Sequence, residues 1–103
     1  GPVIAILGDT VPCENAERLA RDADVLVHEA TFMEAEAKLA RQYGHSTTVE
    51  AAALAKTCRV GRLIVTHISA RYQGRESEFK AEVVTAFGNS HVASDFDEII
   101  VGD

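Results

Sequence analysis

Side chains able to bind a metal ion follow three short apolar stretches of this 103-residue sequence, where each stretch ends. They are Asp9 after residues 3–7, His28 and Glu29 after residues 25–27, and His67 after residues 63–65. Short apolar runs of this kind are typical of buried strands, and functional groups collect at the carboxyl ends of strands in α/β sheets. Because carboxylates and imidazoles suit a divalent cation such as zinc, the pattern indicates a candidate metal site.

Each of these residues also has an ordinary structural interpretation. Asp9 could cap the turn that follows it, because aspartate is common in turns. A single histidine after a strand, such as His67, is more often a hydrogen-bonded residue of the core. His28 is equally ambiguous, and we expect His91, in a polar stretch, to be solvated. Spacing therefore leaves both the metal site and the structural alternative open.

Helix-forming stretches separate the apolar runs. Apolar spacing and helix-forming composition predict helices over residues 15–23, 33–43, 48–58 and 76–87. Gly44 is a natural helix stop, and Thr47 followed by Glu50 matches a capping box that opens the third helix. Two short closing strands are expected at 92–93 and 98–101. This alternation predicts an α/β fold with largely parallel strands, in a single domain over residues 1–103.

Composition narrows the class of protein. With 47% hydrophobic and 25% charged residues, and no apolar run near the length of a membrane span, the sequence is typical of a soluble globular domain. Its net charge of −6 is a poor match for a free-standing nucleic-acid binder. Cys13 and Cys58 lie too far apart in the sequence for a CxxC zinc motif. They favour a reduced, cytoplasmic compartment, although one disulfide stays open.

Four short motifs occur in a definite order. They are Gly8-Asp9-Thr10, His28-Glu29-Ala30-Thr31, Gly44-His45-Ser46-Thr47, and the segment from Thr66 to Tyr72. Their order and spacing resemble the C-terminal half of ribonuclease Z, a family of tRNA 3′-processing endoribonucleases in the metallo-β-lactamase superfamily. The resemblance covers nearly the whole chain and implies the C-terminal half of an αβ/βα sandwich.

The resemblance also implies an activity and a metal site. Ribonuclease Z cuts tRNA precursors after the discriminator base, leaves a 3′-hydroxyl and uses two zinc ions. On this resemblance, Asp9 is the carboxylate that bridges the two ions and His67 is a terminal ligand of one of them. His45 resembles the residue that gives a proton to the leaving ribose oxygen, a role that suits a pKa near neutrality. Glu29 is expected to orient a neighbouring histidine.

Three further residues have candidate roles in binding substrate. By the same resemblance, Ser69, Arg71 and Tyr72 contact phosphate or nucleotide. Packing of the loop after His67 is an equally good explanation for these three side chains, and the sequence does not choose between the two.

The sequence also departs from the family pattern. Its four histidines include no HxH pair, so the superfamily's HxHxDH signature, which supplies most of the metal ligands, is absent. The family's basic arm has no counterpart either. Since Asp9 and His67 cannot complete two zinc sites, we expect the chain to be inactive without the rest of the enzyme.

Two alternatives remain beside the ribonuclease Z segment. One is a segment of another phosphodiesterase or sulfatase of the superfamily. The other is a non-catalytic, self-associating module, because half a sandwich exposes an apolar sheet face and such surfaces drive association. We therefore expect a homodimer, with a tRNA precursor as the partner of the complete enzyme and no membrane partner.

Overall fold

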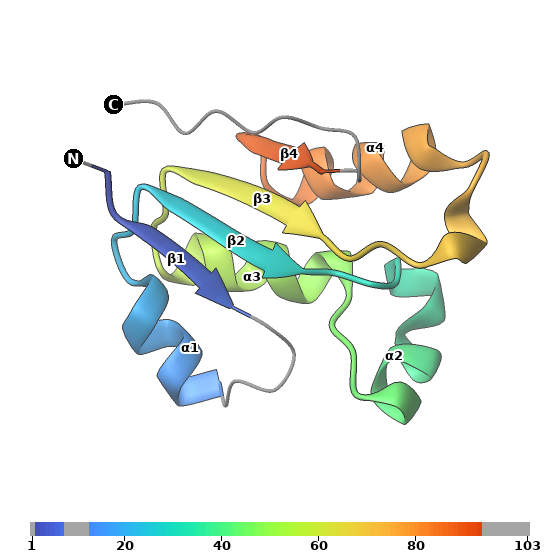
Figure 1. Cartoon of the computed structure of the whole chain (residues 1–103), viewed down its shortest axis with the longest axis horizontal. Helices are drawn as coiled ribbons and strands as arrows, with labels where there is room; N and C mark the ends of the chain where they lie inside the picture. The colour runs from blue at the N-terminus through green and yellow to red at the C-terminus, as the bar shows by residue number, and fades with distance from the viewer. Residues whose placement is uncertain (1, 8–12, 94–103) are drawn as a thin grey trace.

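The computed structural model describes residues 2–7 and 13–93 (Figure 1). Within these ranges, four parallel strands form one sheet in the order β1-β2-β3-β4. The strands are β1 (Ile4–Leu7), β2 (Val25–Glu29), β3 (Arg62–Thr66) and β4 (Ser90–Val92). The helical elements are α1 (Cys13–Ala20), the 3-10 turn η1 (Glu34–Glu36), α2 (Ala37–Tyr43), α3 (Thr48–Thr57), the 3-10 turn η2 (Ala70–Tyr72) and α4 (Glu76–Ala86). The parallel sheet and its alternating helices confirm the predicted α/β class.

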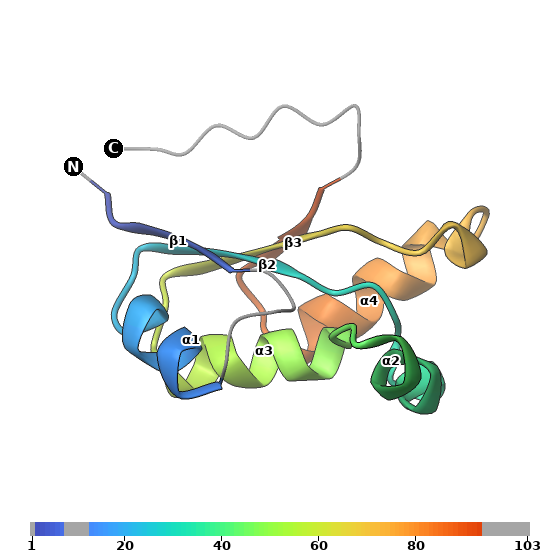
Figure 2. The ribbon, with the colours of Figure 1, turned by 60° about the horizontal axis from the view of Figure 1, so that its bottom comes forward.

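The helices all lie on the same side of the sheet (Figure 2). Helix α3 crosses the middle of that face and presents three buried alanines to it, Ala51, Ala52 and Ala55. Because alanine side chains are short, the helix can approach the strands closely. Leu26 of β2 and Leu63 of β3, both fully buried, fill the layer between the helix and the sheet. This layer is the hydrophobic core.

The predicted start of α3 and the predicted end of the helix before it are confirmed. The Thr47 hydroxyl accepts a hydrogen bond from the Glu50 backbone N–H at 3.1 Å, and the Glu50 carboxylate accepts one from the Thr47 N–H at 2.9 Å. These two bonds form the expected capping box. Gly44 ends α2 with φ of 71°, a left-handed conformation that glycine adopts without the steric cost of a Cβ.

Some local predictions were wrong. The single helix expected over 33–43 is divided into η1 and α2, because Glu36 at the junction has a non-helical backbone conformation. The first helix begins and ends earlier than expected, at Cys13 and Ala20. His91, expected in a solvated loop, lies half-buried in β4, which pairs with β3. The strand predicted over 98–101 lies outside the described residues.

The face of the sheet opposite the helices carries apolar side chains. Along β1, Ala5 and Leu7 are buried towards the helices, whereas Ile4 and Ile6 are exposed, Ile6 to 75%. The apolar runs predict a sheet buried on both faces. No helix within 2–7 and 13–93 covers this second face (Figure 2). The side chains of Ile4 and Ile6 stay exposed there. None of the helices in these ranges is long and apolar enough to cross a bilayer.

Candidate metal and catalytic site

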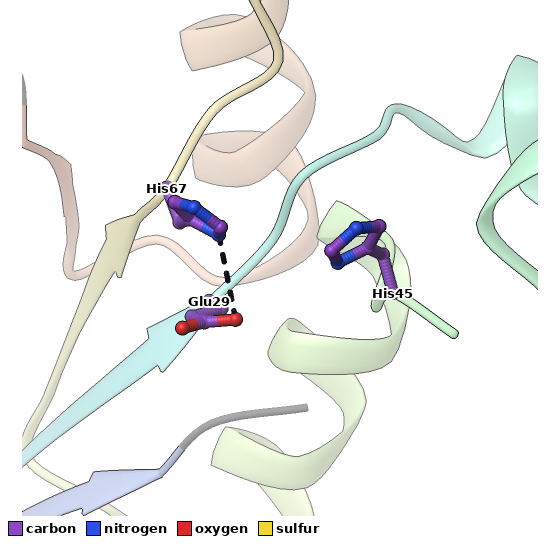
Figure 3. Close-up of side chains that lie close together, drawn as sticks. All are labelled: Glu29, His45 and His67. Atoms are coloured by element: carbon purple, nitrogen blue, oxygen red, sulfur yellow. Dashed lines mark ion pairs between the residues drawn. The ribbon is translucent and has the colours of Figure 1, made fainter. Parts of the chain in front are cut away.

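Three side chains meet at the carboxyl edge of the sheet: Glu29, His45 and His67 (Figure 3). Each offers one ligand atom, and these three atoms all lie within 4.8 Å of one another. A carboxylate oxygen of Glu29 is 3.5 Å from Nδ1 of His67. The two imidazole rings of His45 and His67 have their centroids 6.1 Å apart. Residues separated by 38 positions in the sequence thus form one cluster.

The sheet positions two of these side chains directly. Glu29 ends β2, where it pairs with Thr66, and His67 follows Thr66 at the end of β3. Since the two strands are parallel and adjacent, their carboxyl ends deliver both side chains to the same point. His67 has φ of 61°, an uncommon backbone conformation for a residue other than glycine. Such conformations gather at functional sites, where the surrounding structure holds them in place.

His45 reaches the cluster by another route. It follows the left-handed Gly44, and its N–H donates to the Ala40 carbonyl at 2.8 Å, which fixes the turn that ends α2. The next residue, Ser46, accepts hydrogen bonds from the N–H groups of Thr31 and Phe32. These bonds close a loop that leaves the sheet after Glu29 and returns beside it, and His45 lies at the returning end.

The donor set of the cluster fits zinc. One carboxylate and two imidazoles are common zinc ligands, and two ligands of a tetrahedral zinc ion lie about 3.4 Å apart when each bond is about 2.1 Å. The 3.5 Å between Glu29 and His67 matches that separation. The His67 side chain is 63% exposed and that of Glu29 is 32% exposed, so an ion and its water can reach both. The core interpretation of His67 is therefore wrong.

The other residues after the apolar runs have different outcomes. Asp9 lies outside the described residues, so its role as a bridging ligand stays a prediction. His28 is buried, and its Nδ1 is 2.6 Å from the Glu29 carbonyl oxygen, to which it donates. Because side chains alternate along a strand, His28 lies on the helix-facing side, away from the carboxylate of Glu29.

The three candidate substrate-binding residues also have different surroundings in the structure. Arg71 is exposed, and its guanidinium carbon lies 5.8 Å from the centre of the Phe32 ring, which in turn is 6.0 Å from the ring of His45. The Ser69 hydroxyl accepts from the Arg71 N–H at 3.3 Å and starts η2. Tyr72 is buried to 1% exposure, which favours the packing alternative for that residue. Phe32 lies between Arg71 and His45, and no feature of the sequence identified it as a residue of the site.

A hollow of about 690 Å³ adjoins His67. It lies between the loop after β3, the start of α4 and the end of β4. Its polar lining includes Ser69, Lys80 and His91. The volume falls in the range of sites that bind small ligands. Ser69 after β3 and His91 of β4 thus contribute to one depression beside the cluster.

This arrangement belongs to a known superfamily. Residues 1–68 match the family model described as "Beta-lactamase superfamily domain", which is more than half of the chain. The chain is therefore a member of the beta-lactamase superfamily. Its fold is also similar to that of the metallo-beta-lactamase fold protein YhfI from Bacillus subtilis, with a TM-score of 0.70 over 86% of this chain and 37% of that chain at 23% identity.

More specific similarity is to ribonuclease Z. The chain is 70% identical over its full length to 34% of "Ribonuclease Z" from Exiguobacterium sp.. It is 52% identical, over 94% of its length, to 32% of "Ribonuclease BN" from Proteus mirabilis. Its fold is similar to that of human tRNase Z, short form, with a TM-score of 0.73, 37% identity, and coverage of 97% of this chain and 34% of that one. The chain thus spans about a third of the length of the relatives it matches.

Proposed function

We propose that this chain is a segment of a zinc-dependent endoribonuclease that removes the 3′ trailer from tRNA precursors. The observation that carries the proposal is the meeting of Glu29, His45 and His67 at one point of the sheet edge. All three residues come from the motifs that carry the resemblance to ribonuclease Z, and Glu29 also ends the strand β2. An alternative phosphodiester or sulfate ester substrate finds no specific support in the geometry.

In the complete enzyme, Asp9 and His67 hold zinc, together with ligands from outside this chain. Bound zinc supplies an activated water and stabilises charge on the phosphoryl oxygens. Glu29 holds the orientation of the His67 imidazole through its carboxylate, 3.5 Å from Nδ1. His45 donates a proton to the ribose oxygen that leaves, and its place beside His67 brings that proton close to the reacting phosphate.

Substrate contacts extend from this point in two directions. Arg71 lies on the Phe32 side of the cluster, where its exposed guanidinium can pair with a phosphate of the RNA. Ser69 faces the hollow next to His67 and can contact a nucleotide there. The net charge of the chain, −6, supports a tRNA-gripping surface that lies mostly in other parts of the enzyme.

We also propose that the chain forms a homodimer and works in the cytoplasm. The exposed Ile4 and Ile6 on the open face of the sheet support association, because a second copy would remove them from water. Cys58, a buried free thiol, supports a reducing compartment.

Cleavage of a tRNA precursor by the complete protein tests the proposal. The wild-type protein with zinc is expected to release the 3′ trailer and leave a 3′-hydroxyl on the tRNA. The variants Asp9→Ala and His67→Ala should each abolish cleavage and lower the bound zinc measured by atomic emission. Full cleavage and full zinc content in both variants would contradict the assignment of Asp9 and His67 as zinc ligands. Cleavage of a sulfate ester or another phosphodiester in preference to the tRNA precursor would favour a sibling hydrolase.

A further inference from the structure

Tyr72 carries a buried hydroxyl that joins two separate segments. The hydroxyl donates to the carboxylate of Glu36 and accepts a hydrogen bond from the Met33 N–H at 2.8 Å. Its ring packs against Phe79 of α4, with the two ring centroids 5.3 Å apart. Burial raises the pKa of the Tyr72 phenol, and so does its hydrogen bond to Glu36. The group therefore keeps its proton, and its ability to donate, at neutral pH.

The two segments are those that carry the histidines of the cluster. Tyr72 ends η2, five residues after His67, in the loop that follows β3. Met33 precedes η1 and Glu36 ends it, and η1 leads into α2 and so to His45. Bonds from the one hydroxyl to both Met33 and Glu36 thus tie the His67 loop to the base of the segment that presents His45.

The same two segments have one other direct backbone connection, which is closer to the sheet. The Ser69 N–H donates to the Thr31 carbonyl at 3.0 Å. Near the cluster, the exposed side chains of Arg71 and His67 also contact Phe32 and Glu29. The Tyr72 contacts lie beyond the bond between Ser69 and Thr31, so together they give two fixed points and determine the relative orientation of the segments.

We propose that Tyr72 is a positioning residue, whose hydroxyl sets the separation of the His45 and His67 imidazoles by holding their two segments together. It acts through these segments and does not touch the reacting atoms. This inference rests on the proposed function, because the cluster that Tyr72 positions is the proposed metal and catalytic site. It assigns to the hydroxyl a task different from the substrate contact that the sequence predicts.

Titration of the chain with Zn²⁺ alone tests the proposal. Imidazole signals of His45 and His67, followed by NMR, are expected to shift together in the wild-type chain with one shared dissociation constant. Tyr72→Phe keeps the ring that packs on Phe79 and removes only the hydroxyl. This variant should raise the dissociation constant about tenfold, because the loop that carries the proposed zinc ligand His67 loses a group that orients it. Tyr43→Phe, at an exposed tyrosine of α2, is the matched control and should change nothing.

Variants of Glu36 separate positioning from general stability. Glu36→Gln keeps an oxygen that accepts from Tyr72 and should bind Zn²⁺ like wild type, whereas Glu36→Ala should match Tyr72→Phe. The double variant Tyr72→Phe/Glu36→Ala should be no weaker than either single variant. A residue that only stabilises the fold would lower the melting temperature and leave the zinc affinity of the folded chain unchanged.

In the complete enzyme, Tyr72→Phe should lower kcat and leave KM near the wild-type value. An unchanged zinc affinity and kcat in Tyr72→Phe would overturn the proposal, as would His45 and His67 signals that respond to Zn²⁺ independently in the wild type. If the complete protein fails to cut tRNA precursors, the proposed function falls, and the zinc titration still decides the role of Tyr72.

Discussion

The histidines of the cluster differ in how the chain holds them. His67 follows a strand directly and adopts a left-handed backbone conformation, so its position depends on the sheet. His45 depends on the turn at Gly44 and on the loop that returns to Ser46. Two residues of the same chemical type therefore reach the cluster from different elements, which agrees with the different tasks that we propose for them, zinc ligand and proton donor.

This difference gives a prediction for His45. If it is the proton donor, His45→Ala in the complete enzyme should lower turnover about a hundredfold or more while the zinc content stays unchanged. Single-turnover cleavage of a tRNA precursor and metal analysis measure the two quantities. Gln42→Ala, at an exposed position of α2, is the control. Loss of zinc in His45→Ala would instead identify His45 as a metal ligand, as the compact cluster also permits.

At the scale of elements, the turn before β3 sets the start of that strand and thereby the position of His67, which follows its end. Gly61 donates its N–H to the Ala23 carbonyl at 3.0 Å, and its carbonyl accepts from the Asn89 side chain at 2.6 Å. A Cβ at Gly61 would lie 2.7 Å from the backbone oxygen of Asp24. Glycine is therefore required there by the close approach of the turn that precedes β2.

Substitution at this turn should be costly. Because the clash is with backbone, Gly61→Ala should lower the free energy of unfolding by about 1–3 kcal/mol, the usual cost of overpacking. Gly88→Ala is the matched control, since a Cβ there would meet nothing within 4 Å, and it should change stability little. Urea denaturation followed by circular dichroism gives both values. Equal stability of the two variants would show that the turn can adjust without cost.

At the scale of the whole molecule, the described sheet has helices on one face, and on the other face β1 exposes Ile4 and Ile6 while Ile64 of β3 is buried. The cluster lies at an edge of this sheet and offers three ligand atoms. These two features lead to separate expectations about association and about metal binding by the chain.

Association should depend on the exposed apolar side chains of β1, Ile4 and Ile6. Ile6→Lys replaces a side chain that is 75% exposed on β1, and it should weaken dimerisation about tenfold or more by removing apolar area from the contact. Leu19→Lys, at a residue of α1 that is 59% exposed, is the control and should leave dimerisation unchanged. Analytical ultracentrifugation measures the dissociation constants. A wild-type chain that stays monomeric at high concentration contradicts the expectation.

Metal binding and catalysis by the chain should both be weak. With few of the ligands that two zinc sites require, the chain should lose zinc on dialysis and should not cut a tRNA precursor. Metal analysis after dialysis and a cleavage assay test these two points. Stoichiometric zinc together with cleavage by the 103-residue chain would show that the site is complete without further protein.

The local order of this protein could be predicted from its sequence. The apolar runs, the capping box from Thr47 to Glu50 and the stop at Gly44 depend on neighbours within a few residues, so the strands, helices and parallel sheet followed from the pattern. The motif that contains His67 likewise gave its place at a strand end. The strand expected at 92–93 is present with shifted bounds, as β4 over Ser90–Val92, because its extent depends on a tertiary pairing with β3 and His91 itself is polar.

Tertiary structure decided how these parts meet. The sequence gives no measure of the 3.5 Å between Glu29 and His67 or of the approach of His45, because both result from strand register and the path of a loop. Tyr72 shows the same limit: the resemblance to ribonuclease Z implied a substrate contact, and only the folded chain shows its hydroxyl bound to Glu36 and Met33. Short-range patterns fix elements since their causes are local, whereas a site depends on distances between elements that only packing sets.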